Sequence, residues 1–516
     1  MKRFNLTGLC IPARHYMVDL TDKVNQIMRD YIDQGAYFTI NRARQFGKTT
    51  LINALETHMQ GKYTVISISF EAADEYFVNQ QIFVNGIVMD IAEALERAGV
   101  DEDIVKEWDQ KIEGDYPLKM LSRKISNLCK KLEKNAILMI DEVDKSSDNQ
   151  IFLNFLGMLR DKYLKREKGM DTTFQSVILA GVYDVKNLKL KIRPDEERKY
   201  NSPWNIAADF CIDMSFSINE IAKMLMEYSV DTGIEMDFQG ISEKIYFYTN
   251  GYPFLVSWIC KWIDETGSKA WTIQNVENAE NELLKSDNTL FDDMIKNVEN
   301  NRELKDTITG MLFDGLRIPF IKSDFVVNLG ILFGIFIEKR NTVNISNIIF
   351  ETYLYNHIIA GKIRKQGVFE YEKNQFIENG QLNMERALNK FQEIMKAEYR
   401  DENEDFIERQ GRLLFLCFMK PIINGRRNYY VEPETRNNTR MDVVISYGGQ
   451  KHIVELKIWH GQQDRQKGIE QLETYLESRN CDKGYLISFS FQKNKEYIRK
   501  VVILERSKKE VYEIVV

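Results

Sequence analysis

The stretch Arg44-Gln-Phe-Gly-Lys-Thr-Thr50 lies between the apolar run 37–40 and the helix-like segment 51–55. A strand, a turn with Gly-Lys-Thr and a helix form the pattern of a phosphate-binding P-loop. Backbone N–H groups at the helix start can hold phosphates, Lys48 can reach the outer phosphates, and the Thr49 hydroxyl can ligate Mg²⁺. The stretch therefore predicts a nucleotide site with these candidate cofactor-binding residues: Arg44, Gln45, Phe46, Gly47, Lys48, Thr49 and Thr50.

The loop departs from the usual G-x-x-x-x-G-K-[ST] pattern at its first position, where Arg42 replaces glycine. Glycine at this position normally supplies a backbone geometry that arginine adopts poorly. The departure leaves open the affinity of the loop for nucleotide, and a structural or decayed loop is the alternative.

A second motif lies further along the chain. The run Asn135-Ala-Ile-Leu-Met-Ile140 is typical of a buried parallel strand, and it ends in Asp141 and Glu142. In this Walker B arrangement Asp141 would hold Mg²⁺, and Glu142 would orient or deprotonate the attacking water. A core strand followed by an acidic turn is the alternative. Together the two motifs predict ATP hydrolysis, with ATP and Mg²⁺ as cofactors.

Further apolar runs predict a doubly wound α/β sheet. The run 63–70 ends at Glu71, and the run 176–180 ends in Gly181-Val-Tyr-Asp184. Strands that alternate with helical stretches favour an α/β domain that binds its ligands at the carboxyl ends of the strands. Tyr183 and Asp184 thus stand where a γ-phosphate sensor could lie, although an ordinary turn explains them as well.

Residues from 1 to about 290 resemble the AAA-like ATPase domains of the signal-transducing (STAND) and archaeal-type ATPases. The resemblance rests on the P-loop and on the segments Cys10–Asp19, Met139–Glu142 and Thr249–Leu255. It implies that the segment before the P-loop packs near the nucleotide base and that Gly251-Tyr-Pro253 belongs to a helical lid. Arg44 and Gln45 before Gly-Lys-Thr also fit this group.

The expected organisation has four segments: a P-loop AAA-like ATPase core (1–212), a helical lid (213–290), a winged-helix-like region (291–365) and a C-terminal α/β domain (380–516). Ser217 predicts the N-cap of the first lid helix. In the third segment, 302–313 and 323–329 predict helices, and 334–338 and 342–345 predict a short hairpin. Such a module can bind DNA, but a brace between domains is favoured.

The C-terminal segment carries a separate set of polar residues. Met441–Ile445 and His452–Ile458 read as two strands joined by a turn at 447–450. Residues two apart on a strand share a face, so Glu455 and Lys457 project together, and the hairpin can bring Asp442 beside them. Two carboxylates and an ammonium can bind Mg²⁺ and hold a water for attack on a phosphodiester. An ordinary exposed Glu–Lys pair is the alternative.

This segment resembles the PD-(D/E)XK nuclease superfamily, which has a restriction-endonuclease-like α/β fold. Gln471 and Tyr475 match the Gln-x-x-x-Tyr pattern after the catalytic strand, and Glu408 falls where the first-helix acidic residue is expected. Glu434 is a rival for that carboxylate, and Met441 replaces the usual proline. Over both sites the candidate catalytic residues are Glu142, Asp442, Glu455, Lys457, Glu408 and Gln471, and the candidate metal ligands are Thr49, Asp141, Asp442 and Glu455.

Composition agrees with a folded protein of about three domains. The 516 residues include 44% hydrophobic residues, and the net charge of −7 argues against a surface that coats nucleic acid. The basic residues around the C-terminal site are still suited to phosphate contacts: Lys420, Arg426, Arg427, Arg436, Arg440, Lys451 and Lys457. Six cysteines without a C-x-x-C pair and the lack of a signal peptide or long apolar run predict a cytoplasmic protein.

The sequence thus predicts an ATPase that controls a Mg²⁺-dependent nuclease-like domain acting on nucleic acid, with DNA favoured over RNA. No membrane association is expected, and a homo-oligomer is one possible form of assembly. A nucleotide-dependent signalling or scaffold protein, whose C-terminal domain binds but does not cleave, is the alternative. A nucleotide switch with negligible hydrolysis is a third.

Overall fold

The computed structural model of the protein describes residues 2–71, 73–143, 150–181, 204–266, 270–314, 316–366, 373–378, 381–398, 408–423, 429–430, 443–447, 450–459, 462–478, 481–490, 496–504 and 506–516. Asp442, Tyr183, Asp184, Glu434 and Met441 therefore lie outside the described residues. The chain forms two compact units. The first comprises Met1–Asn297, Ile321–Lys339 and Asn344–Phe350, and the second comprises Val298–Phe320, Arg340–Val343 and Glu351–Val516.

A four-stranded parallel sheet is the centre of the first unit. Its order is β3-β6-β5-β4, with β3 at Phe38–Asn41, β6 at Ser176–Gly181, β5 at Ala136–Asp141 and β4 at Thr64–Ser69. The three pairings are all parallel. Nearly every residue of these strands is buried, as expected for a sheet that is covered on both faces. The predicted α/β class and parallel sheet are confirmed.

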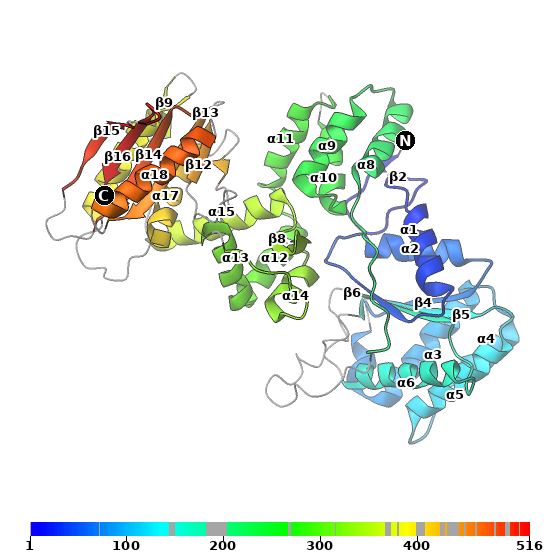
Figure 1. The fold of residues 1–516 in the computed structure, drawn as a ribbon. Helices are drawn as coiled ribbons and strands as arrows, with labels where there is room; N and C mark the ends of the chain where they lie inside the picture. The colour runs from blue at the N-terminus through cyan, green and yellow to red at the C-terminus, as the bar shows by residue number, and fades with distance from the viewer. Residues whose placement is uncertain are drawn as a thin grey trace. The chain divides into compact units, whose positions relative to one another are not determined.

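Helices cover both faces of this sheet (Figure 1). On one face lie α1 (Thr21–Ile27), the π-helical turn Met28–Ile32 and α2 (Lys48–Met59), whose apolar residues share one core with β3. On the other face α3 (Gln80–Arg97), α4 (Glu102–Trp108), α5 (Pro117–Lys131) and α6 (Gln150–Glu167) form a second core. A short parallel pair, β1 (Arg3–Phe4) and β2 (His15–Tyr16), precedes them, and a 3₁₀ turn, Asp74–Val78, precedes α3.

Four helices then follow as a bundle: α8 (Ile218–Thr232), α9 (Phe238–Thr249), α10 (Pro253–Glu265) and α11 (Ile273–Leu283). The predicted N-cap of α8 is present as a capping box. The Ser217 hydroxyl accepts from the Glu220 N–H, and the Glu220 carboxylate accepts from the Ser217 N–H. Beyond it come α12 (Thr289–Asn300), α13 (Arg302–Asp314), α14 (Phe325–Leu332), β7 (Phe336–Lys339), β8 (Thr342–Ile345) and α15 (Ile348–Gln366). These helices and strands follow the order expected for residues 302–345.

The second unit contains a mixed six-stranded sheet of order β11-β12-β13-β14-β16-β15. Its strands are β11 (Tyr429–Tyr430), β12 (Val443–Tyr447), β13 (Gln450–Ile458), β14 (Lys483–Phe489), β15 (Arg499–Ile503) and β16 (Glu510–Val515). The predicted hairpin is present, with Tyr447 opposite Gln450, whereas β13, β14 and β16 run parallel. Connecting β13 to β14 in parallel requires a crossover, and α18 (Gln462–Ser478) supplies it.

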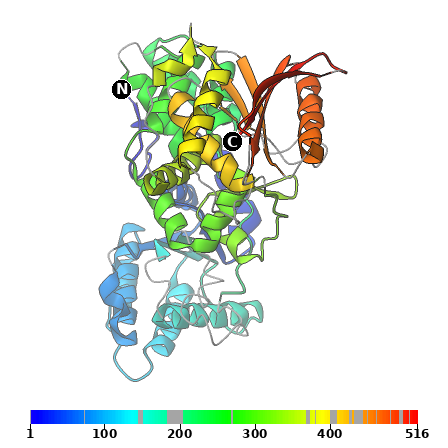
Figure 2. The same cartoon turned by 90° about the vertical axis from the view of Figure 1, so that its left-hand side faces the viewer.

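Helices also cover both faces of the second sheet (Figure 2). Helix α18 packs with Ile453, Leu486 and Val511 in one apolar cluster. On the other face lie α16 (Met384–Glu398) and α17 (Glu408–Ile423), where Gly411 leaves room for the ring of Phe489. A 3₁₀ turn, Lys373–Phe376, and the antiparallel pair β9 (Ile377–Glu378) and β10 (Gln381–Leu382) precede α16.

Candidate functional site

The P-loop joins β3 to α2, and its bend is made by two residues with left-handed backbone. Gln45 has φ +56° and Gly47 has φ +81°. Alternation of left-handed and ordinary residues turns successive backbone N–H groups toward one point, and the resulting concavity binds anions. Helix α2 begins directly afterwards at Lys48, so its N-terminal N–H groups face the same place. The loop thus has the backbone geometry of a phosphate site.

Arg42, which stands in place of the first glycine, has no left-handed backbone in this structure. Its guanidinium donates to the carbonyl oxygens of Asn41 and Ile212, each at 2.8 Å, and lies 5.4 Å from the centroid of the Phe210 ring. Burial lowers the pKa of this guanidinium. The backbone of this loop therefore does not require glycine at position 42, because the positive φ angles occur at Gln45 and Gly47 instead.

Lys48 and Thr49 are the first two residues of α2, directly after the bend. The Lys48 ammonium donates to the carbonyl oxygens of Arg42 and Ala43, at 2.8 and 3.0 Å. The Thr49 hydroxyl is 3.4 Å from Asp141 Oδ2 at the carboxyl end of β5. A hydroxyl beside a carboxylate is a donor set suited to Mg²⁺, which takes oxygen ligands. The structure therefore brings the two predicted motifs together.

Glu142 follows Asp141 with a left-handed backbone, at φ +56°. Its N–H group donates to Asp141 Oδ1 at 2.9 Å, which orients the Asp141 carboxylate. A non-glycine residue in this region stores strain, and such strain is common at functional positions. Glu142 also lines the same cavity as Lys48 and Thr49. Its placement fits a role beside the outer phosphates.

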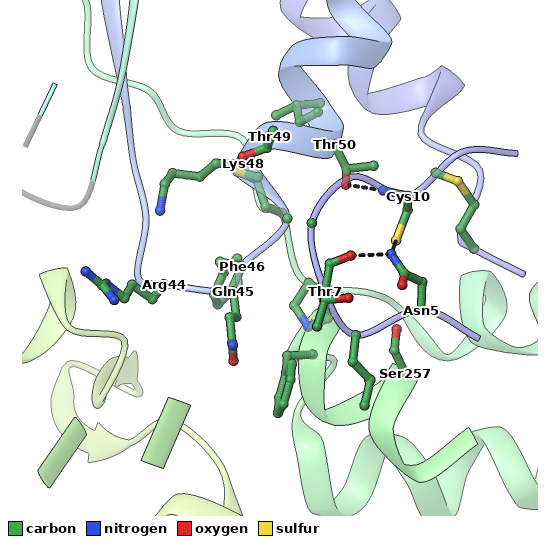
Figure 3. A pocket seen from close by; sticks show the side chains of 18 of the residues that line it. Asn5, Thr7, Cys10, Arg44, Gln45, Phe46, Lys48, Thr49, Thr50 and Ser257 are labelled. Atoms are coloured by element: carbon green, nitrogen blue, oxygen red, sulfur yellow. Dashed lines mark hydrogen bonds between the residues drawn. The ribbon is translucent and has the colours of Figure 1, made fainter. Parts of the chain in front are cut away.

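A cavity of about 760 Å³ opens beside the P-loop. Residues 44–51 form one wall, and the opposite walls come from the N-terminal segment and the start of α10 (Figure 3). The Cys10 N–H donates to Thr50 Oγ1 at 3.2 Å, and the Asn5 amide donates to the Thr7 carbonyl at 2.7 Å. The resemblance implied a segment 10–19 near the base. No motif in the sequence pointed to three further lining residues, Asn5, Thr7 and Ser257.

The Gly-Tyr-Pro motif of the lid contacts the P-loop directly. The Tyr252 hydroxyl donates to the Arg44 carbonyl at 2.6 Å, and its ring meets that of Phe46 edge-on, with centroids 4.6 Å apart. Complete burial raises the pKa of Tyr252, so the hydroxyl stays protonated and can donate. Gly251 has φ +73°, and it packs so closely on Phe216 that an added Cβ would lie 2.1 Å from the Phe216 carbonyl oxygen. These contacts explain why tyrosine stands at position 252 and glycine at position 251.

In the second unit, Glu455 and Lys457 lie together on β13 as predicted. Lys457 Nζ is 2.8 Å from Glu455 Oε1, and the Glu455 side chain is fully buried. The pair is therefore not the exposed Glu–Lys contact that was the alternative. Opposite on β12, Val443 pairs with Val454, the neighbour of Glu455. Asp442, the residue before Val443, lies outside the described residues.

Helix α18 covers this pair. Gly468 leaves room for the stem of Lys457, since an added Cβ would lie 3.3 Å from Lys457 Cγ. The predicted residue Gln471 lies on the same helix, and its Oε1 is buried with no hydrogen-bond partner among the described residues. Helix α17 begins at Glu408, but the side chain of that residue is outside the described part of the chain. Gln471 thus lies on the helix that packs against Lys457, and the position of the Glu408 side chain is not described.

A second buried carboxylate on the same sheet has no motif that predicts it. Glu513 on β16 is fully buried and accepts from Arg465 of α18 at 2.7 and 2.8 Å, while Lys500 lies 3.5 Å away. Leu486 pairs with Glu455 on one side and with Glu513 on the other, so both carboxylates project from one face of the sheet. Residues 465 and 513 are far apart in sequence, and only the pairing of β14 with β16 brings them together.

Within the described residues, no group of three or more His, Cys, Asp or Glu side chains could hold a metal ion. Asp442 is not among those residues. Nor is any described helix long and apolar enough to cross a membrane.

Comparison with known proteins matches residues 15–356 to a family described as AAA-like domain. No curated protein matches the sequence significantly. Among solved structures, a Walker-type ATPase of Pyrococcus abyssi is similar with a TM-score of 0.45 and 11% identity, over 68% of this chain and 99% of that one. The ORC2 protein of Aeropyrum pernix has a TM-score of 0.37 and 12% identity, over 66% and 94%. The ORC1 protein of the same organism, solved with DNA, has a TM-score of 0.30 and 10% identity, over 67% and 94%.

Proposed function

This chain belongs to the AAA-like domain family, and we propose that its P-loop binds ATP with Mg²⁺ and hydrolyses it. The observation that carries the proposal is the meeting of two features beside one cavity. The left-handed bend at Gln45 and Gly47 forms an anion concavity, and Thr49 lies 3.4 Å from Asp141 beside it. The cavity of about 760 Å³ is of the size that binds small molecules.

Each residue has one role in this proposal. The backbone N–H groups of the loop and of the α2 start bind phosphate oxygens, and the Lys48 ammonium stabilises the outer phosphates. Thr49 and Asp141 hold Mg²⁺, which supplies charge neutralisation when it is bound. Glu142 orients the attacking water and accepts its proton. The N-terminal residues Asn5, Thr7 and Cys10 lie where the base would be received.

Two substitutions test these roles. Lys48→Ala should weaken binding of a fluorescent ATP analogue by about ten-fold or more, because a charge-assisted contact is lost. Glu142→Gln should bind the analogue yet release no phosphate. Lys62→Ala is the matched control, since Lys62 is exposed and its ammonium contacts Asp33, at 2.8 Å, and the Tyr63 ring, at 5.3 Å, outside the loop. If Lys48→Ala binds and hydrolyses ATP as the wild type does, the proposal is wrong.

We further propose that the C-terminal α/β domain is a Mg²⁺-dependent nuclease-like domain acting on DNA, controlled by the nucleotide state of the P-loop. The supporting observation is the Glu455–Lys457 pair on β13, in which the carboxylate is fully buried and the lysine side chain is 19% exposed. Burying a carboxylate is costly, and such a group persists where a charged partner and function favour it. Asp442 and Glu455 would hold the metal, Lys457 would act on the attacked phosphate, and Glu408 and Gln471 would assist.

The assay is cleavage of single- and double-stranded DNA and of RNA, with Mg²⁺ or Mn²⁺, in the presence and absence of ATP. Asp442→Asn and Glu455→Gln should each abolish cleavage, with circular dichroism to confirm folding. Lys500→Ala is the control, since Lys500 lies on the same sheet, is 41% exposed and contacts Glu513 rather than Glu455. If the wild-type protein binds nucleic acid but cuts no substrate under any condition, a nucleotide-dependent signalling or scaffold protein replaces the nuclease proposal.

A further inference from the structure

Gln45 is the one residue of the P-loop bend that adopts left-handed backbone without being glycine. An L-residue adopts this conformation only with strain, so other contacts must hold it in place. The Gln45 side chain points away from Thr49 and Thr50 (Figure 3). Its amide nitrogen donates to Thr289 Oγ1 at 2.7 Å. The contact joins the loop to a residue 244 positions later in the chain.

Thr289 is the first residue of α12, which follows the lid helices. The cap of this helix is made by its neighbour, because Asn288 Oδ1 accepts from the Phe291 N–H at 3.0 Å. The Thr289 hydroxyl is therefore not needed to start the helix. Both Thr289 and Gln45 line the cavity beside the P-loop.

A second contact from α12 lies one turn further on. Asp293 Oδ1 is 3.7 Å from Nε of Arg44, the residue before Gln45. Residues four apart lie on one face of a helix, so Thr289 and Asp293 present one surface to the loop. The Asp293 pair is partly exposed and contributes little alone. The Thr289 hydrogen bond is shorter and is made to Gln45 itself, the residue with left-handed backbone.

We propose that Thr289 is a positioning residue for the P-loop, which holds Gln45 in the left-handed conformation required for phosphate binding. This inference rests on the proposed nucleotide binding. Helix α12 then acts as a part of the nucleotide site, although it lies outside the sheet and the motifs that define that site. Glycine at position 45 would adopt the same backbone without strain, and the contact from Thr289 would then have nothing to hold.

The test is a double-mutant cycle read out by the affinity for a fluorescent ATP analogue. Thr289→Val should weaken binding by about five-fold, the equivalent of about 1 kcal/mol for one hydrogen bond. Thr289→Ser, which keeps the hydroxyl, should recover most of that loss. In the background of Gln45→Gly, adding Thr289→Val should change the affinity by less than about two-fold.

The control is Thr474→Val in the second unit, which also removes an exposed threonine hydrogen bond, to the Glu470 carbonyl at 3.0 Å. It should leave the affinity unchanged. An equal loss from Thr289→Val in both backgrounds would overturn the inference, because Thr289 would then act independently of Gln45. No loss in either background would overturn it as well. If the wild-type protein binds the analogue no better than Lys48→Ala, nucleotide binding itself fails, and that result is distinct from both.

Discussion

Replacing Arg42 with glycine should destabilise the first unit without tightening nucleotide binding. Arg42→Gly restores the usual first glycine of the P-loop pattern. Arg42, however, has ordinary backbone geometry, so glycine would relieve no strain. Its guanidinium instead ties the loop to Ile212, which lies in the segment that leads to α8. The substitution removes that tie and leaves the Ile212 carbonyl oxygen without this donor.

The size of the effect follows from the interactions that the substitution removes. A hydrogen bond from a charged donor contributes about 1.5–3 kcal/mol. The interaction with the Phe210 ring, at 5.4 Å, contributes about 0.5–1 kcal/mol more. Glycine also gives the unfolded chain more freedom, at a cost of about 0.5–1 kcal/mol. Returning the buried guanidinium to water offsets part of the total, so we expect a net decrease in the free energy of unfolding of about 2–4 kcal/mol.

Urea unfolding of the first unit measures this decrease, followed by a fluorescence probe within that unit because the two units need not unfold together. The control is Arg97→Ala, since Arg97 is exposed and donates to the Ser67 carbonyl at 3.1 Å. It should cost less than about 1 kcal/mol. If Arg42→Gly keeps wild-type stability and binds an ATP analogue more tightly, the arginine is a defect of the loop and our reasoning is refuted.

Two other predictions concern the lid. Gly251→Ala should destabilise the first unit by about 3 kcal/mol or more in thermal unfolding, because its Cβ would lie 2.1 Å from the Phe216 carbonyl oxygen. The control is Gly233→Ala, which has a similar φ but open space around its Cβ and should cost about 1 kcal/mol in that assay. Burial raises the pKa of Glu280 to about 7, against the opposing effect of Lys244, so the folded protein keeps a proton that the unfolded chain has lost. Stability should therefore fall as the pH rises from about 4.5 to about 7, by on the order of 3 kcal/mol, and urea midpoints of Glu280→Gln should lack that slope.

The sequence predicted the elements that local patterns encode. The apolar runs before Asp141 and after the P-loop became β5 and β4, and Ser217 became an N-cap. The predicted hairpin that carries Glu455 is present, with Tyr447 opposite Gln450. In each case the residues that decide the structure lie within one strand, turn or helix end.

The remaining features depend on contacts between distant parts of the chain. Thr289 has no motif around it, and its role appears only when α12 lies against the P-loop. The partnership of Arg465 with Glu513 requires the parallel pairing of β14 and β16. Arg42 looked like a departure from a pattern, because the sequence does not reveal which loop residue carries the positive φ.

The position of the Lys48 ammonium limits how much this side chain can contribute to nucleotide affinity. The ammonium already donates to two carbonyl oxygens of its own loop. An incoming triphosphate must compete with those oxygens, and only the surplus of the new contacts over the old ones contributes to binding. A diphosphate, whose outer phosphate the ammonium can also reach, meets the same competition but offers the ammonium fewer phosphate oxygens. The discrimination between the two nucleotides at Lys48 is thus smaller than the strength of a lysine–phosphate contact alone would indicate.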